Sequence, residues 1–122
     1  MSEFTVPVLG FAAFSGTGKT TLLKKLLPLL RDKGLRVAVI KHAHHNCDVD
    51  KPGKDSYELR KAGATPMLIS SSVRMAMMLE YEQPAEPVLA DLIDYLPLHR
   101  IDCVLVEGFK QESFTKIELH RP

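Results

Sequence analysis

The first forty residues hold the feature that most constrains the fold, an apolar run followed by a tight turn and a leucine-rich segment. Residues 6–14 are apolar on both faces of an extended chain, which predicts a buried strand. Leucines at helical spacing then predict an amphipathic helix over 19–33, and Leu35–Ile40 is a second apolar run. Strand, helix and strand in this order predict a βαβ unit with parallel strands. The chain is therefore expected to adopt an α/β fold with a mainly parallel sheet flanked by helices.

The rest of the chain is expected to complete one domain, 1–122, because it contains no repeat, no low-complexity block and no glycine- or serine-rich linker. Asp55 is predicted to cap a short helix, with Glu58 as its partner in a variant of the capping box and Gly63 at the end of the helix. The other predicted elements are a hairpin of strands 66–70 and 75–81, strands 101–106 and 115–120, and an amphipathic helix 86–96 with Val88, Leu89, Leu92, Ile93 and Leu96 on its apolar side.

Composition excludes several classes of protein. Hydrophobic residues make up 45% of the chain and charged residues 25%, which are globular values rather than those of a disordered or fibrous chain. No apolar stretch approaches the roughly 20 residues of a membrane span. A secretory signal requires basic residues near the N-terminus, and no basic residue precedes Lys19. Cys47 and Cys103 are the two cysteines, too few for a disulfide framework. We therefore expect a cytoplasmic protein without a membrane partner.

The net charge of +1 hides an uneven distribution of charged residues. Residues 1–63 contain 11 basic and 6 acidic residues, a balance of +5, whereas residues 64–122 contain 5 basic and 9 acidic residues, a balance of −4. A basic half suits a phosphate ligand, although two differently charged solvated faces explain the same numbers. Nucleic acid is not an expected partner, because tryptophan is absent, aromatic residues make up 7% and no basic stripe alternates with aromatic residues.

Residues 13–20, Ala-Phe-Ser-Gly-Thr-Gly-Lys-Thr, match the phosphate-loop pattern G-x-x-x-x-G-K-[ST] at every position except the first. There Ala13 stands in place of glycine, which tolerates a wider range of backbone angles. The motif follows a predicted buried strand and opens a predicted helix, an arrangement that aims backbone N–H groups and the positive end of the helix at an anion. The alternative is a glycine turn that merely joins a strand to a helix. The context favours a nucleotide site.

In a phosphate loop each of these residues has a definite task. The amides of Gly16 through Thr20 would cradle the α- and β-phosphates, and Lys19 would reach the β- and γ-phosphate oxygens. Thr20 would supply a hydroxyl to Mg²⁺, and Thr21 would contact the α-phosphate. The predicted nucleotide-binding residues are therefore Ser15, Gly16, Thr17, Gly18, Lys19, Thr20 and Thr21.

A phosphate loop also needs an acidic residue that supports the metal, and Glu107 is the predicted one. Glu107 directly follows the apolar run 101–106, so its carboxylate should emerge at the carboxyl edge of the sheet, where open α/β sheets bind ligands. It would bind Mg²⁺ through water or orient an attacking water, and with Lys19 it forms the predicted catalytic pair. The alternative is a surface ion pair at a strand end. Asp102, at the start of the same strand, should lie at the opposite edge and be structural.

The segment 41–50 contains three histidines, one cysteine and two aspartates. Imidazole and thiolate ligands suit Zn²⁺ or Ni²⁺, so His42, His44, His45 and Cys47 could serve a nucleotide-gated metal chaperone. Their spacing is not that of a structural zinc site, however, and the favoured interpretation is a polar loop that helps to bind phosphate, Mg²⁺ or a second substrate.

Four segments in order resemble the molybdopterin-guanine dinucleotide biosynthesis adapter family, MobB, over nearly the whole chain. They are Phe11-Ala12-Ala13-Phe14-Ser15-Gly16-Thr17-Gly18-Lys19-Thr20-Thr21-Leu22, Ile40-Lys41-His42, residues 48–64, and Leu105-Val106-Glu107-Gly108-Phe109-Lys110. The resemblance implies a P-loop NTPase-like three-layer fold, a homodimer, binding of GTP with Mg²⁺, and weak GTPase activity. It also implies partnership with the guanylyltransferase that attaches GMP to molybdopterin. Members of this family usually continue beyond the position of Pro122, so a C-terminal part of the sheet or interface is expected outside this sequence.

The choice of GTP over ATP depends on the resemblance alone. The guanine-reading motif N/T-K-x-D has only a distant counterpart in residues 115–118, Thr-Lys-Ile-Glu, which alternation already explains as a strand. A small phosphate-loop kinase is the remaining alternative. It commonly needs an arginine-rich lid, and the arginines after residue 64, which are Arg74, Arg100 and Arg121, are not clustered.

Overall fold

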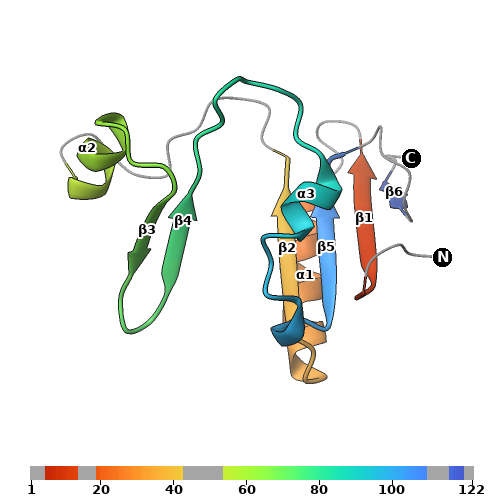
Figure 1. Ribbon diagram of the computed structural model, residues 1–122. Helices are drawn as coiled ribbons and strands as arrows, with labels where there is room; N and C mark the ends of the chain where they lie inside the picture. The colour runs from red at the N-terminus through yellow and green to blue at the C-terminus, as the bar shows by residue number, and fades with distance from the viewer. Residues whose placement is uncertain (1–4, 14–18, 43–53, 110–115, 120–122) are drawn as a thin grey trace. The chain divides into compact units, whose positions relative to one another are not determined.

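A computed structural model describes residues 5–13, 19–42, 54–109 and 116–119 of this chain, and it divides the chain into two compact units (Figure 1). The first unit takes residues 1–42 and 87–122, and the second takes residues 43–86. Each unit has its own sheet. In the described ranges no helix is both long and apolar enough to cross a bilayer.

Within the described residues, the sheet of the first unit has four parallel strands in the order β2-β5-β1-β6 (Figure 1). These strands are β1 (Val8–Ala13), β2 (Val37–Lys41), β5 (Cys103–Glu107) and β6 (Lys116–Leu119). The predicted α/β class with a parallel sheet is thus confirmed. β1 and β2 are not neighbours, however, because β5 lies between them and pairs with both.

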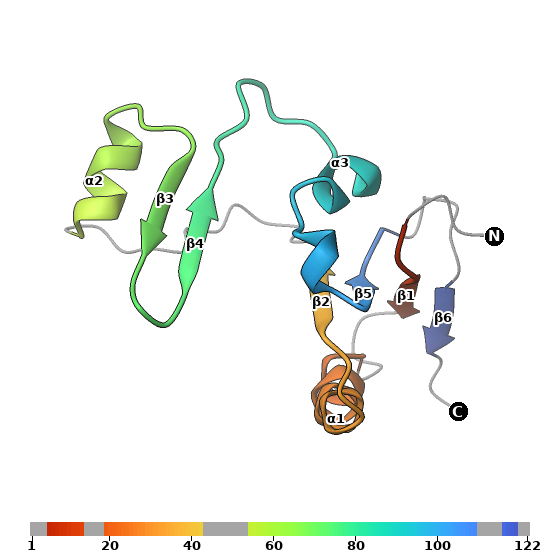
Figure 2. The ribbon, with the colours of Figure 1, turned by 60° about the horizontal axis from the view of Figure 1, so that its bottom comes forward.

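Helices cover both faces of this sheet, so the first unit has three layers (Figure 2). Alternation along β5 explains this arrangement, since successive side chains point to opposite faces. Val104 and Val106, both fully buried, pack with Leu89 and Ile93 of α3 (Leu89–Ile93). On the other face, Leu105 packs with Phe11 and with Leu23 of α1 (Lys19–Asp32). Burial of each such side chain contributes about 1.5–3 kcal/mol, which fixes both helices against the sheet.

Gly34 ends α1 as the leucine pattern predicts. Its φ of 82° lies in the left-handed region, which glycine adopts without steric cost. The Gly34 N–H donates to the Arg31 carbonyl at 2.9 Å, and the Leu35 N–H donates to the Leu30 carbonyl at 3.1 Å. This pair of bonds is the Schellman motif. The motif satisfies two of the last helical carbonyls and turns the chain toward β2.

The helix predicted over 86–96 is much shorter in the structure. Only Leu89–Ile93 is helical, and Val88, predicted on the apolar side, is 49% exposed. Val88 is extended, with φ −102° and ψ 123°, so the helix begins one residue after it. Leu89 and Ile93 still reach the core because they are four residues apart, on one face. Beyond them the Tyr95 N–H donates to Leu92 and the Leu96 N–H to Ile93, so the last turn tightens before a 3₁₀ turn, η1 (Leu98–Arg100).

Asp102 lies at the amino-terminal end of β5 and has the structural role predicted for it. Its carboxylate accepts the Arg36 backbone N–H at 2.6 Å and the Arg36 Nε–H at 3.2 Å. These hydrogen bonds to the Arg36 side chain and backbone hold the pKa of Asp102 below the ordinary value for an aspartate. The pair thus joins the start of β2 to the start of β5.

We expect this pair to make the stability of the protein depend on pH in the acidic range. Because the pKa of Asp102 is lower in the folded protein than in the unfolded chain, its contribution is present at neutral pH. The contribution is lost as the pH falls from about 4 through the lowered pKa. Urea midpoints at pH 7 and pH 3 should therefore differ less in Asp102→Asn than in the parent protein. Equal pH dependence in both proteins would contradict this role.

The second unit consists of α2 (Asp55–Lys61) and an antiparallel hairpin of β3 (Met67–Ser70) and β4 (Met75–Met78). The predicted hairpin is confirmed, and Ser71 closes its turn by donating its N–H to the Arg74 carbonyl at 2.9 Å. The hydroxyl oxygen of Ser71 also accepts the N–H groups of Val73 and Arg74. This serine explains why the loop between the strands is tight without a glycine.

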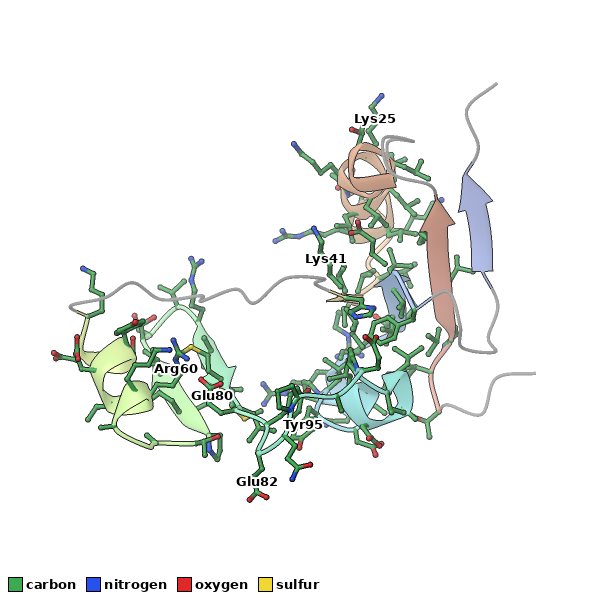
Figure 3. The ribbon with its side chains drawn as sticks, turned by 90° about the horizontal axis from the view of Figure 1, so that it is seen from above. Lys25, Lys41, Arg60, Glu80, Glu82 and Tyr95 are labelled. Carbon is green, nitrogen blue, oxygen red and sulfur yellow. The ribbon has the colours of Figure 1, made fainter. Side chains whose placement is uncertain are left out.

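The predicted capping box at the start of α2 is wrong. Lys54 is the N-cap, since the first helical bond runs from the Glu58 N–H to the Lys54 carbonyl, and its side chain makes no capping bond. Asp55 is instead inside the first turn, where its charge favours the positive end of the helix. The buried Arg60 side chain joins α2 to the segment that follows β4 through an ion pair with Glu80 (Figure 3). Gly63 ends the helix, as predicted.

Candidate functional site

The candidate site lies at the carboxyl edge of the parallel sheet in the first unit. β5 runs beside β1 with Glu107 opposite Phe11, and beside β2 with Glu107 opposite Lys41. All three strands point the same way, so their last residues meet at one edge (Figure 1). Open α/β sheets bind ligands at this edge because loops leave the sheet there and helix N-termini face it.

A strand precedes the predicted phosphate loop and a helix follows it, in the order that the sequence predicts. β1 ends at Ala13 and α1 begins at Lys19, while residues 14–18, which include Ser15, Gly16, Thr17 and Gly18, lie outside the described residues. Ala13 is the last residue of β1, and alanine adopts the extended conformation of a strand readily. Alanine is therefore compatible with this position, where the pattern has a glycine. Lys19 and Thr20 are the first two residues of the helix, and the exposed Thr21 follows them.

The amino-terminal end of α1 is suited to an anion. The helix is 14 residues long and has no acidic residue in its first turn. Its first N–H groups have no partner within the helix, and the helix dipole places partial positive charge at this end. A phosphate group at this position would accept hydrogen bonds from the N–H groups without competition from a carboxylate in the first turn of the helix.

Glu107 is the last residue of β5, at the edge where the apolar run predicts it. It is only 6% exposed, an unusual degree of burial for a glutamate. Its backbone carbonyl accepts the His42 N–H at 2.9 Å, and the next residue, Gly108, donates its N–H to the Phe11 carbonyl at 3.3 Å. The backbone on both sides of the carboxylate is thus tied to β1 and to the end of β2.

A tight corner follows Glu107, and the sequence pattern did not predict it. Gly108 has a φ of 97° and Phe109 a φ of 57°, so two successive residues are left-handed. A left-handed conformation costs a bulky residue on the order of 1–3 kcal/mol. Phe109 is 5% exposed and packs in the core cluster with Ile40 and Ile93, and burial of such a ring returns about 1.5–3 kcal/mol. The only sequence signal for this corner was the glycine after the acidic residue.

His42 packs against this corner from the end of β2. Its ring centroid lies 5.0 Å from that of Phe109, with an angle of 34° between the ring planes. A Cβ atom added at Gly108 would lie 2.8 Å from the Cβ of His42, closer than side chains tolerate. The end of β2 and the segment after β5 therefore approach each other as closely as a glycine permits.

The histidine-rich segment is only partly within the described residues. His42 is described, whereas His44, His45, Cys47, Asp48 and Asp50 are not. Among the residues that the structure does describe, no three His, Cys, Asp or Glu side chains are grouped to hold a metal ion. The residues 116–118 of the weak guanine-reading candidate belong to β6 and pair with β1, so that segment is a strand.

The donor set at this edge fits a magnesium-bound phosphate group. The helix start supplies N–H donors and the position of Lys19 supplies a cationic residue, whereas Glu107 supplies carboxylate oxygens, which Mg²⁺ prefers. Lys41, at the end of β2, is exposed and adds positive charge near the same edge (Figure 3). These residues can bind an anion, place a divalent cation and orient a water molecule.

Comparison with known proteins gives consistent matches over this chain. The family model described as "Molybdopterin guanine dinucleotide synthesis protein B", MobB, matches residues 8–122. The "Molybdopterin-guanine dinucleotide biosynthesis adapter protein" of Escherichia coli (strain K12) is 54% identical over 116 residues, which is 95% of this chain and 66% of that protein. The protein of the same name from Haemophilus influenzae is 47% identical over 120 residues, 95% of this chain and 64% of that protein.

A solved structure supports the fold. The crystal structure of Bacillus subtilis MobB superposes with a TM-score of 0.75 and 26% sequence identity, covering 93% of this chain and 68% of that one. The chain spans slightly less than two thirds of the length of the relatives from Escherichia coli and Haemophilus influenzae.

Proposed function

Since the chain belongs to the MobB family, we propose that it is a nucleotide-binding adapter of molybdenum cofactor biosynthesis, which binds GTP with Mg²⁺ and assists a guanylyltransferase. The observation that carries this proposal is the placement of Glu107 on β5, directly beside the strand that leads into α1. A phosphate loop and a carboxylate at the next strand end are the two parts that a Mg²⁺-nucleotide site needs.

Each residue of the proposed site has its own role in this proposal. The amides of residues 16–20 bind phosphate oxygens at the start of α1, and Lys19 neutralises the charge on the β- and γ-phosphates. Thr20 and Glu107 hold the magnesium site, and Thr21 contacts the α-phosphate. When bound, Mg²⁺ neutralises phosphate charge. Glu107 either holds a water in the metal shell or orients the water that attacks.

Weak hydrolysis is consistent with this set of groups. Phosphoryl transfer depends on positioned charge around the γ-phosphate, and fast GTPases add an arginine that stabilises the transition state. Among the described residues, Arg31, Arg74 and Arg100 are exposed, and Arg36 and Arg60 form ion pairs with Asp102 and Glu80. We therefore propose slow turnover, with the nucleotide state serving contact with the transferase.

A homodimer is part of this proposal, and the second unit supports it. Within the described residues β3 and β4 pair only with each other, so the hairpin has two edges at which a further strand could add. Apolar side chains on it are exposed, among them Leu68 at 56% and Met75 at 67%. Pairing of hairpins from two chains would cover one edge of each hairpin. Sedimentation equilibrium tests this pairing, and a mass of 13.6 kDa at micromolar concentration would contradict it.

The test of the nucleotide proposal is a calorimetric titration of the purified protein with GTP and, separately, with ATP, each with Mg²⁺. We expect GTP to bind at one site per chain and ATP to bind at least about tenfold more weakly, a difference of about 1.4 kcal/mol. Preference for ATP would instead support a small kinase, and phosphorylation of an acceptor panel would then be measured. No binding of either nucleotide would contradict the proposal for this chain.

A further inference from the structure

The corner of His42, Gly108 and Phe109 adjoins the proposed magnesium-site carboxylate. Glu107 precedes Gly108 directly, and its carbonyl accepts the His42 N–H at 2.9 Å. His42 therefore touches the segment 107–109 three times: by this hydrogen bond, by the close approach of its Cβ to Gly108, and by its ring on Phe109. None of these contacts involves the predicted phosphate loop.

The direction of the Glu107 side chain depends on how this corner is held. Two successive left-handed residues turn the chain sharply after β5, and a left-handed phenylalanine persists only where its surroundings determine it. Phe109 belongs to the core cluster that includes Ile40, Leu89 and Ile93, and the His42 ring contacts it as well. Removal of the His42 ring would leave Phe109 with fewer contacts, so the backbone that carries Glu107 would sample other conformations.

We propose that His42 is a positioning residue for Glu107: its ring, packed on Phe109, keeps the carboxylate at the place where it supports Mg²⁺. This inference rests on the proposed function of Glu107. His42 is half-buried and directly follows β2, so the residue that comes after one strand also contacts the segment that comes after β5. In this role the ring acts through its packing on Phe109.

The distinction between shape and nitrogen chemistry determines the choice of variants. His42→Ala removes the ring but keeps the backbone N–H that donates to Glu107. His42→Phe keeps a ring able to pack on Phe109 and removes both nitrogen atoms. The matched control is His99→Ala, because His99 is an exposed histidine of η1, ahead of the opposite end of β5.

Two measurements on each variant avoid dependence on turnover. The first is hydrogen exchange of the Gly108 amide in the nucleotide-free protein, because this N–H is bonded to the Phe11 carbonyl. The second is the gain in GTP affinity on adding Mg²⁺, taken as the ratio of Kd in EDTA to Kd in Mg²⁺. This ratio reports the magnesium site separately from the phosphate loop.

For His42→Ala we expect the Gly108 amide to exchange about tenfold faster and the Mg²⁺ gain to fall about fivefold, with GTP affinity in EDTA unchanged. His42→Phe should restore both quantities to within about twofold of the parent, and His99→Ala should leave them unaltered. If His42→Phe is as impaired as His42→Ala, the imidazole itself acts on the ligand and the positioning role is overturned.

Glu107→Gln in the same assay distinguishes a failure of the role proposed for Glu107 from a failure of the role proposed for His42. A normal Mg²⁺ gain in His42→Ala together with a reduced gain in Glu107→Gln would leave the role of Glu107 intact and overturn that of His42. A normal gain in Glu107→Gln would remove the proposed role of Glu107, and the positioning role would fall with it.

Gly108→Ala tests the same corner from the other side. The added methyl group would meet the His42 Cβ at 2.8 Å, so one of the two segments must shift, and the φ of 97° adds strain. We expect the Mg²⁺ gain to fall at least as far as in His42→Ala, by about fivefold or more. The double variant Gly108→Ala with His42→Gly removes the atom that the methyl group meets, but it also lacks the ring, so it should not regain the parental value. A parental Mg²⁺ gain in that double variant would overturn the role of the ring.

Discussion

Replacement of Lys19 by alanine is expected to weaken binding of Mg²⁺-GTP by roughly 10- to 100-fold. A hydrogen bond to a charged group contributes about 1.5–3 kcal/mol, and each 1.4 kcal/mol corresponds to about a factor of ten in affinity. Lys19 is the first residue of α1, and in the proposed site its charge would add to the positive end of the helix. Calorimetric titration of the variant with GTP in the presence of Mg²⁺ measures the loss directly.

Lys25→Ala is the matched control for this experiment. Lys25 is exposed on the same helix, and its side chain projects away from the sheet (Figure 3). The variant therefore removes one positive charge from α1 but leaves the helix start intact, and its GTP affinity should stay within about twofold of the parent because a distant exposed charge is screened by salt. Equal losses in both variants would indicate a general charge effect. Unchanged affinity in Lys19→Ala would rule out the assignment of the phosphate loop.

Glu107→Gln is expected to reduce Mg²⁺-dependent GTP hydrolysis by about 100-fold, the lower range for loss of a positioned catalytic group. The substitution keeps the shape of the side chain at a position that is only 6% exposed, so the core around it should remain packed. An amide binds Mg²⁺ less well than a carboxylate and cannot accept a proton from water. Affinity for GTP in EDTA should change by less than about threefold, because the phosphate loop is untouched. Single-turnover release of phosphate, with and without Mg²⁺, measures the effect.

The chain offers a control at the other end of the same strand. Asp102→Asn makes the same change from carboxylate to amide at the amino-terminal end of β5, where Asp102 bonds to Arg36 and not to the proposed site. Hydrolysis at neutral pH should be unaffected in this variant. If Glu107→Gln hydrolyses GTP at the parental rate with the same requirement for Mg²⁺, Glu107 has no part in the reaction and another acid must be sought.

Many elements of the fold could be predicted because the sequence signals for them lie within a few residues of one another. The apolar run of β1, the leucine spacing of α1 and Gly34 at its end each depend on residues close in sequence, and the structure has all three. The hairpin of β3 and β4 was predicted for the same reason, since β-forming residues flank a short polar turn. The location of Glu107 at a strand end followed from the length of an apolar run.

Predictions failed where several local solutions had similar energy. A helix could begin at any of several residues before Leu89, and packing of Leu89 and Ile93 on the sheet decided the outcome, leaving Val88 exposed. At α2 an aspartate is acceptable both as the N-cap and in the first turn. In the structure the Glu58 N–H donates to the Lys54 carbonyl, so the helix begins after Lys54 and Asp55 lies in the first turn.

The sequence by itself determined the class of this protein, the type and order of its elements, and the phosphate-loop pattern with an acidic residue at a later strand end. Only the tertiary structure decided that β5 lies between β1 and β2, that Glu107 is buried, and that His42 meets Gly108 and Phe109. The reason is that periodicity and turn chemistry act over a few residues. Strand order, burial and the left-handed Phe109 depend instead on contacts between segments more than sixty residues apart, such as His42 and Phe109.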